Sequence, residues 1–165
     1  MPNETERKFL IAMPDPARLL AEPGARADRI TQTYLLSPRD VTLRVRRRET
    51  ETGVLYTATK KRRLSDMTAE EQERTITEAQ YRALLAAADP ALSPIEKTRY
   101  TVPFGPHLLE VDVYPFWGRT AILEIELPSE DAPVSLPPYL TVLREVTADK
   151  RYKNVALAKA IPAEP

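Results

Sequence analysis

Short β-type segments of the chain carry like charges at alternating positions, and this pattern limits what the chain can fold into. In 43–46, 110–113 and 123–127, arginines or carboxylates alternate with Val, Ile and Leu. Alternate side chains of a strand lie on opposite faces, so each segment has one apolar and one ionised face. The pairs recur as Glu4/Glu6, Arg44/Arg46, Glu71/Glu73, Lys97/Arg99, Glu110/Asp112 and Glu124/Glu126.

Each charged pair taken alone fits the solvated side of a half-buried strand. The set as a whole differs from such a surface, because solvated faces usually mix signs and use Thr, Ser and Gln, whereas here whole strands carry one sign. Cationic and anionic strands that face each other across a lumen would bind a polyanion. Their carboxylates would hold the metal ions that neutralise it.

The order of the elements predicts one β-rich domain over residues 1–165, a length that buries a single hydrophobic core. Many short strands with few helices are typical of a barrel or a sandwich. We expect strands over 4–12, 30–36, 41–48, 54–61, 70–76, 96–103, 108–114 and 120–127. We expect helices over about 16–21, 78–88 and 149–160.

Composition excludes several kinds of chemistry. The chain has no cysteine and a single histidine, His107, so a thiolate nucleophile or a Cys-containing zinc site is excluded and a Ser-His-Asp triad is disfavoured. Its four glycines form neither phosphate-binding loop motif. Side chains must therefore bind any phosphate. A metal would be held by carboxylate oxygens, which favour Mg²⁺ or Mn²⁺.

Charge and hydropathy predict neither a nucleic-acid nor a membrane partner. Lys+Arg and Asp+Glu both number 24, which gives no net attraction to DNA or RNA. The arginine run 44–48 lacks the interleaved aromatic residues of a base-stacking surface. The N-terminus has no basic region followed by an apolar run, and no apolar stretch reaches the length of a membrane span. We therefore expect a cytoplasmic protein.

Nine short motifs follow one another in an order that resembles a known family. They are Glu4-Thr-Glu-Arg-Lys8, Gln32-Thr-Tyr34-Leu, Leu43-Arg-Val-Arg46, Thr59-Lys-Lys61, Glu71-Gln-Glu73, Glu96-Lys-Thr-Arg-Tyr100, Glu110-Val-Asp112, Glu124-Ile-Glu126 and Glu145-Val-Thr-Ala-Asp-Lys-Arg-Tyr-Lys-Asn154. Together they resemble the CYTH family, the triphosphate tunnel metalloenzymes, and in particular its short bacterial members that hydrolyse inorganic tripolyphosphate. Two departures are Tyr139-Leu-Thr-Val-Leu-Arg144 in place of the usual Trp-Leu-Gly, and Ala69 in place of an arginine.

The resemblance implies an α+β fold, with a closed eight-stranded antiparallel β-barrel, a few flanking helices and the active site in the lumen. It implies metal-dependent hydrolysis of a small triphosphate, with inorganic tripolyphosphate as the expected substrate. Thiamine triphosphatase and class IV adenylate cyclase activities remain alternatives on the same fold. So does a non-catalytic polyphosphate-binding module. The sequence does not determine the oligomeric state or the biological role.

The family motifs also imply a role for individual residues. Glu124 and Glu126 would hold the Mg²⁺ that contacts the triphosphate. Glu4 and Glu6 would hold or orient a second metal with the attacking water, assisted by Asp112. Lys8 and Tyr34 would help to position or deprotonate that water, and Lys61 is preferred over Lys60 as the lysine that faces the tunnel. The expected substrate-binding cations are Lys8, Arg44, Arg46, Lys61, Arg99 and Lys153.

Overall fold

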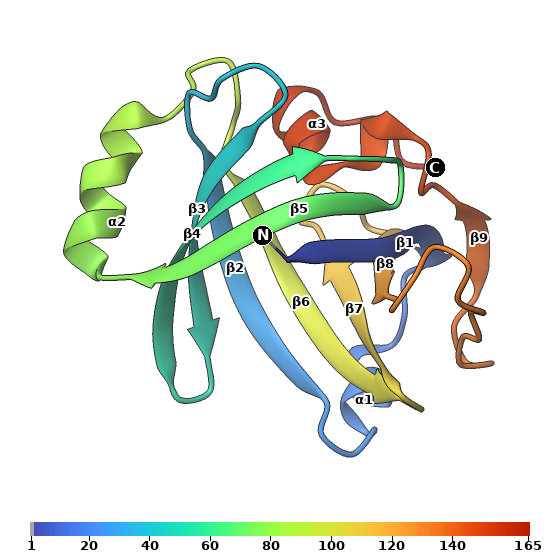
Figure 1. The fold of residues 1–165 in the computed structure, drawn as a ribbon. Helices are drawn as coiled ribbons and strands as arrows, with labels where there is room; N and C mark the ends of the chain where they lie inside the picture. The colour runs from blue at the N-terminus through green and yellow to red at the C-terminus, as the bar shows by residue number, and fades with distance from the viewer. Residues whose placement is uncertain (1) are drawn as a thin grey trace.

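A computed structural model describes residues 2–165 as one nine-stranded antiparallel sheet with short helices (Figure 1). The order of the strands is β5-β4-β3-β2-β6-β7-β8-β1-β9. The strands are β1 (Asn3–Ala12), β2 (Arg26–Tyr34), β3 (Thr42–Thr50), β4 (Gly53–Arg63), β5 (Thr68–Ile76), β6 (Ile95–Phe104), β7 (His107–Val113), β8 (Thr120–Glu126) and β9 (Val142–Glu145).

The sheet closes because β1 pairs on both sides. One edge of β1 pairs with β8, where Lys8 lies opposite Glu124, and the N-terminal part of the strand also pairs with β5, where Glu4 lies opposite Ala69. Eight strands thus form a continuous ring, with β9 added beside β1. The expected closed eight-stranded antiparallel barrel is confirmed.

The alternation seen in the sequence determines which face of each strand is apolar. Phe9 on β1, Val111 on β7 and Leu123 on β8 point out of the barrel into a buried cluster. This cluster is covered by Leu19 of α1 (Pro16–Leu20) and by the segment 132–140. Burying one large apolar side chain contributes about 1.5–3 kcal/mol. The main core therefore lies outside the strand wall, and the lumen is left to the charged residues.

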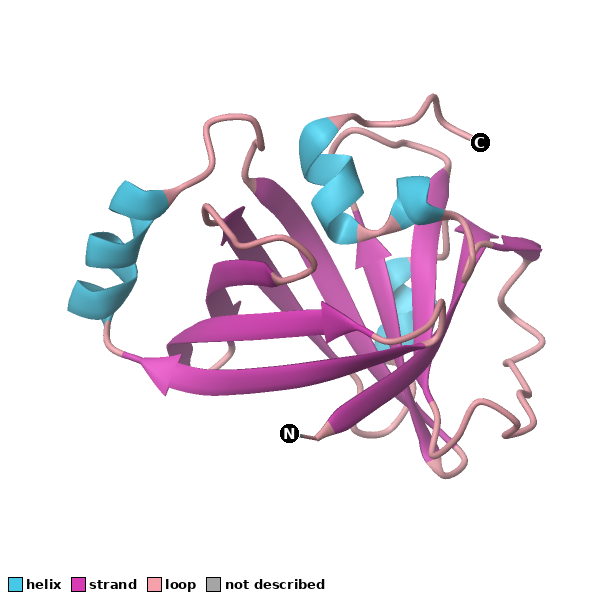
Figure 2. Cartoon of the chain, turned by 45° about the horizontal axis from the view of Figure 1, so that its top comes forward, coloured by secondary structure: helices cyan, strands magenta, loops and turns pink. Residues whose placement is uncertain are grey.

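A second apolar cluster closes one end of the barrel. Leu10, Tyr114 and Trp117 pack there against Tyr152 and Leu157. The last two residues belong to a 3₁₀ turn, η2 (Lys150–Tyr152), and to α3 (Asn154–Lys159). The helices lie on the outside of the barrel and over this end, cyan in Figure 2.

Helix α2 (Glu78–Leu84) covers the outside of β3, β4 and β5. It begins with a capping box, in which Thr77 accepts from the backbone N–H of Gln80 and the Gln80 side chain accepts from that of Thr77. Tyr81 of the helix packs on Val45 and Ile76. This apolar contact explains why the outer face of β3 is not charged throughout.

Several elements differ from the sequence prediction. Strand β2 covers Arg26–Tyr34, whereas a strand over 30–36 was expected. The helix expected over 78–88 changes at Leu85 into a 3₁₀ turn, η1 (Leu85–Ala87). The helix expected from residue 149 is split into η2 and α3, because Lys153 between them has an extended backbone. Strand β9 was not predicted at all. Its four residues are exposed and lack an apolar alternation, and they form a strand only because an edge of β1 is free there.

Within residues 2–165, no helix is long and apolar enough to cross a membrane.

Candidate functional site: a charged cavity inside the barrel

The lumen of the barrel contains a cavity of about 460 Å³ whose lining is mostly ionised. Ten of the twelve residues predicted for the site line it, and they come from six strands and from the segment before α3. The ten are Glu4, Glu6, Lys8, Tyr34, Arg44, Arg46, Lys61, Arg99, Glu124 and Lys153. Asp112 and Glu126 are not part of the lining.

Arg44 and Arg46 are cations without an ion-pair partner among the described residues. Arg46 is 6% exposed and donates only to the amide oxygen of Gln32, at 3.2 Å from Nε and 2.8 Å from Nη2. The Nε of Arg44 is buried and makes no hydrogen bond. Neither guanidinium forms an ion pair within residues 2–165. Burial, together with the positive charges of Arg44 and Arg99, lowers the pKa of Arg46 to about 9. Arg44 and Arg46 therefore have unused N–H donors and positive charge with which to bind an anion.

Three glutamates crowd the neighbouring wall formed by β1 and β8. Burial, assisted by the charge of Glu124, raises the pKa of Glu6 to about 8. Burial also raises the pKa of Glu4, and the nearby carboxylate of Glu71 adds to this shift although Lys61 opposes it. Carboxyl groups whose pKa is raised in this way have too little positive charge around them.

The carboxylate wall was expected to hold Mg²⁺ or Mn²⁺. Its donors fit a hard cation, since they are all carboxylate oxygens, and Oε2 of Glu4 is buried without a hydrogen-bond partner. Within residues 2–165, however, no three such side chains converge as a finished ligand set. The donors Glu4, Glu6 and Glu124 therefore suit a metal ion in their chemistry, and the metal stays a prediction.

Two lysines partly neutralise these carboxylates. Lys8 is 3% exposed, and its Nζ lies 3.1 Å from an oxygen of Glu124 and donates to the backbone carbonyl of Tyr152. Burial pushes the pKa of Lys8 down, but Glu124 and Glu6 outweigh that effect and the pKa is raised. Lys8 therefore remains an ammonium group, which can position a water molecule or a phosphate but has no lone pair with which to accept a proton.

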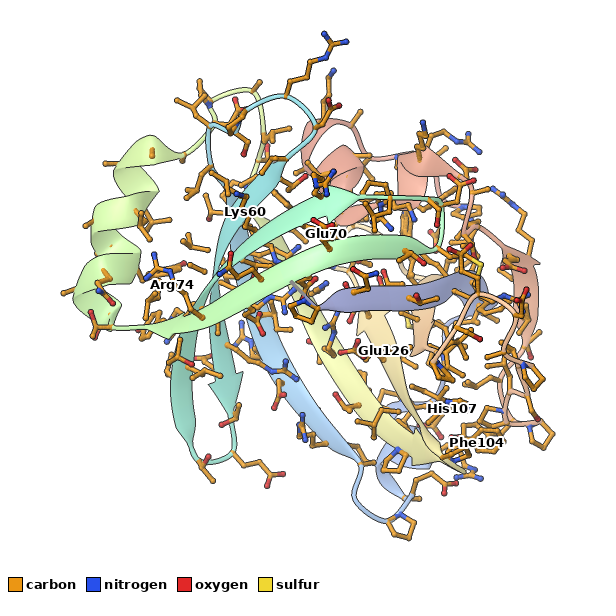
Figure 3. All side chains as sticks on the ribbon, viewed as in Figure 1. Lys60, Glu70, Arg74, Phe104, His107 and Glu126 are labelled. Atoms are coloured by element: carbon orange, nitrogen blue, oxygen red, sulfur yellow. The ribbon has the colours of Figure 1, made fainter. Side chains whose placement is uncertain are left out.

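The lysine on β4 that faces the cavity is Lys61. Its Nζ lies 3.2 Å from Glu4 and 3.7 Å from Glu71. Lys60 is exposed on the outer face of the same strand (Figure 3). The two lysines alternate as neighbours on a strand must.

Lys153 reaches the cavity from the far end of the chain. Its Nζ donates to the carbonyl oxygens of Asp66 and Thr147, both at 3.1 Å. Burial and the charge of Lys8 lower its pKa to about 8. Lys153 thus ties the β4–β5 turn to the segment before α3 while its ammonium group lines the cavity.

Asp112 lies behind the cavity wall rather than in it. Its side chain is fully buried. Arg99 donates from Nε to Oδ1 at 2.8 Å and from Nη2 to Oδ2 at 2.9 Å. Lys97 also donates to Oδ2, at 2.8 Å. Burial favours the neutral acid, but Arg99 and Lys97 outweigh it and lower the pKa of Asp112 to about 2. Both oxygens are already engaged, so this arrangement does not support the predicted assistance to a metal ion. Asp112 instead holds Arg99 in place.

Glu126 lies at the end of β8, opposite Glu6 in the strand register, and is exposed (Figure 3). Burial of part of its carboxyl group raises its pKa, and Glu4 and Glu110 add to the shift. It therefore belongs to the same negative region as Glu4 but stands outside the cavity lining.

The sequence prediction gave no role to several residues that the fold brings to the cavity. Arg48 and Arg63 line it because they continue the alternations of Arg46 on β3 and of Lys61 on β4. That continuation was a signal available in the sequence. Asn154 also lines the cavity, and it accepts a hydrogen bond from Tyr114 at 2.6 Å. Asn154 ends the ninth family motif, so the sequence contained a signal for it, but no role was assigned to it.

Comparison with known proteins connects this geometry to a family. No model of a protein family matches the chain. An inorganic triphosphatase of Nitrosomonas europaea is 38% identical over 166 residues, which cover 97% of this chain and 99% of that protein. A solved structure of an inorganic triphosphatase has a TM-score of 0.59 and 35% identity, with 99% of both chains covered.

A third similarity extends to the fold alone. A protein of Pyrococcus horikoshii OT3 has a TM-score of 0.61 with 21% identity, over 78% of this chain and 80% of that one. The identity of 38% to the Nitrosomonas europaea protein, over nearly the full length, is well above the range in which only a shared fold can be concluded. The nine motifs, the closed barrel and this relative agree, and the protein belongs to the CYTH family of triphosphate tunnel metalloenzymes.

Proposed function

We propose that the protein hydrolyses inorganic tripolyphosphate to pyrophosphate and phosphate inside the barrel. The observation that carries the proposal is the pair Arg44 and Arg46, two guanidinium groups without carboxylate partners that face the same cavity as Glu4, Glu6 and Glu124. A protein that only bound polyphosphate would gain from the arginines but not from the glutamates. The inorganic triphosphatase activity of the Nitrosomonas europaea relative supports the same choice.

The lining of the cavity favours an inorganic substrate over thiamine triphosphate or ATP. Tyr34 is the one aromatic residue among the lining side chains of residues 2–165, and it is 3% exposed. Val41 and Val155 are the aliphatic residues in that lining. A thiazole or an adenine ring needs an apolar or stacking surface. Such a surface is missing from the cavity walls.

The cations of the chain would bind and orient the substrate. Arg44 and Arg46 can each donate two hydrogen bonds to phosphate oxygens. Lys8 would hold the attacking water or a phosphate oxygen near Glu124 by donating from its ammonium group. The oxygen of the water forms a bond to the terminal phosphorus, the bridging P–O bond breaks, and the leaving pyrophosphate keeps the bond's electrons. A proton of the water passes to a phosphate oxygen of the products. Positioning and neutralisation of charge contribute most of the catalysis in phosphoryl transfer.

Glu4, Glu6 and Glu124 would hold Mg²⁺ or Mn²⁺. When bound, such an ion supplies charge neutralisation and Lewis acidity to a phosphoryl-transfer site. The raised pKa values of Glu4 and Glu6 support a place for added positive charge at this wall.

The decisive experiment measures phosphate release from tripolyphosphate, ATP and thiamine triphosphate, with and without Mg²⁺. We expect the highest kcat/KM with tripolyphosphate and Mg²⁺. A preference for ATP or thiamine triphosphate would transfer the proposal to that substrate. Tight binding of tripolyphosphate without turnover under any metal would replace the enzyme by a binding module.

A further inference from the structure

Gln32 on β2 connects two residues of the cavity and is itself fully buried. Its Oε1 accepts from Nε and Nη2 of Arg46, and its Nε2 lies 2.9 Å from the hydroxyl oxygen of Tyr34. Gln32 and Tyr34 are two residues apart on one strand, and they lie opposite Arg46 and Arg44 on β3. The three side chains therefore form one chain of hydrogen bonds along the inner wall.

The direction of each hydrogen bond in this chain is fixed by Arg46. A guanidinium can only donate, so the side of the Gln32 amide that faces it must be the oxygen. The amide nitrogen then faces Tyr34 and donates, and the Tyr34 oxygen accepts. Turning the amide over would place its N–H groups against those of Arg46. The orientation of the Gln32 amide thus follows from the donor-only chemistry of Arg46.

The Tyr34 hydroxyl is the last group in this chain of hydrogen bonds. Its oxygen already accepts from Gln32, and within residues 2–165 its hydrogen has no acceptor. Tyr34 lines the cavity next to the unpaired guanidinium of Arg44. The free hydrogen is therefore available to an anion in the cavity.

We propose that Gln32 is a positioning residue that sets Arg46 and directs the Tyr34 hydroxyl to donate to a phosphate oxygen of the substrate. This inference rests on the proposed function for the identity of the anion. It assigns Tyr34 the role of a donor to substrate, in place of a group that deprotonates water. It also gives the Gln32-Thr-Tyr34 motif a physical reason, since one residue of the motif orients the other.

The test is a double-mutant cycle between Gln32→Glu and Tyr34→Phe, with tripolyphosphate and Mg²⁺. A carboxylate at position 32 still accepts from Arg46 but also accepts from Tyr34, which withdraws the hydroxyl hydrogen from the cavity. In the unaltered protein, Tyr34→Phe should raise KM and lower kcat/KM by about tenfold or more, since hydrogen bonds to charged groups are stronger than neutral ones. In the Gln32→Glu background, we expect the same change to cost less than about twofold. A full effect of Tyr34→Phe in both backgrounds would overturn the inference.

Two controls separate this result from damage to the fold and from failure of the proposed function. Thr31→Glu places a carboxylate on the outer side of the same strand and should leave the effect of Tyr34→Phe intact. A crystal structure of the unaltered protein soaked with tripolyphosphate in metal-free buffer gives a second measurement, which needs neither turnover nor a folded variant. We expect the Tyr34 oxygen within hydrogen-bond distance of a phosphate oxygen while it still accepts from Gln32. Bound tripolyphosphate with Tyr34 out of reach would refute the inference even if the enzyme is active. Absence of turnover would count against the proposed function alone.

Discussion

The ammonium group of Lys61 lies 3.2 Å from Oε2 of Glu4, a buried oxygen that accepts no well-oriented hydrogen bond. The contact neutralises charge without satisfying the geometry of the carboxylate. Glu71 on the neighbouring strand is 3.7 Å from the same nitrogen. One lysine thus compensates two carboxylates, and this part of the barrel has a surplus of negative charge that a divalent cation can relieve.

We therefore expect hydrolysis to require Mg²⁺ or Mn²⁺ and to stop with a chelator. The metal should also raise the melting temperature, because a ligand that binds only the folded state stabilises it, by about 2.7 kcal/mol at a hundred times its Kd. Glu6→Gln should abolish turnover and most of this thermal shift. Glu70→Gln is a matched control, since Glu70 pairs with Arg62 away from the cavity lining. Full turnover in metal-free buffer would refute the prediction.

The two unpaired arginines on β3 should matter for binding and not for folding. Arg44→Ala or Arg46→Ala should lower kcat/KM by about 10- to 100-fold, since hydrogen bonds to charged groups contribute about 1.5–3 kcal/mol. The melting temperature should stay unchanged or rise, because each variant removes a buried or half-buried charge that forms no ion pair within residues 2–165. Arg47→Ala on the outer face of the same strand should leave kinetics unchanged. Loss of cooperative unfolding in the Arg44 or Arg46 variant would place these residues in the structural framework instead.

Sequence alone could predict most of the cavity lining because a strand has a period of two. The closed barrel was implied by the resemblance to the family, since the order of the elements alone left a barrel or a sandwich. Once Glu4 is assigned to the inner face of β1, Glu6 and Lys8 must follow, and the same holds for Arg44 and Arg46 on β3. The choice between inside and outside was also decided by the apolar residues in between. This alternation is a local property of the sequence, so its interpretation needs no knowledge of the fold.

Contacts between distant segments of the chain could not be predicted from the period of a strand. Asp112 has the same alternation as the lining residues, yet Arg99 and Lys97 on β6 engage both of its oxygens. Alternation predicts the face of a side chain but not how deep it lies. Strand β9 likewise exists only through its pairing with β1, more than a hundred residues earlier in the chain.

Glu124 and Glu126 share one face of β8 but differ in burial, and their variants should differ accordingly. Glu124 is 6% exposed and pairs with Lys8, whereas Glu126 is exposed. We expect Glu124→Gln to lower kcat by several orders of magnitude and to weaken Mg²⁺ activation. Glu126→Gln should also impair Mg²⁺ activation, by a smaller factor. Steady-state kinetics over a range of Mg²⁺ concentrations compares the two variants. If both have the turnover and the metal affinity of the unaltered protein, neither glutamate belongs to the site.

We expect Asp112 to stabilise the fold and to position Arg99. Asp112→Asn leaves the buried Lys97 without its counter-charge and leaves Arg99 with Glu110 alone. Breaking one side of a buried ion pair costs about 3–5 kcal/mol. Urea unfolding should show this loss of free energy, and kcat/KM should fall as Arg99 loses its orientation. Glu78→Gln in the exposed pair with Arg82 is the control and should produce no measurable change. The Mg²⁺ concentration for half-maximal activity separates the two roles of Asp112. It should stay constant in Asp112→Asn if the carboxylate only holds Arg99, and a large increase with unchanged stability would restore Asp112 as a residue that assists the metal.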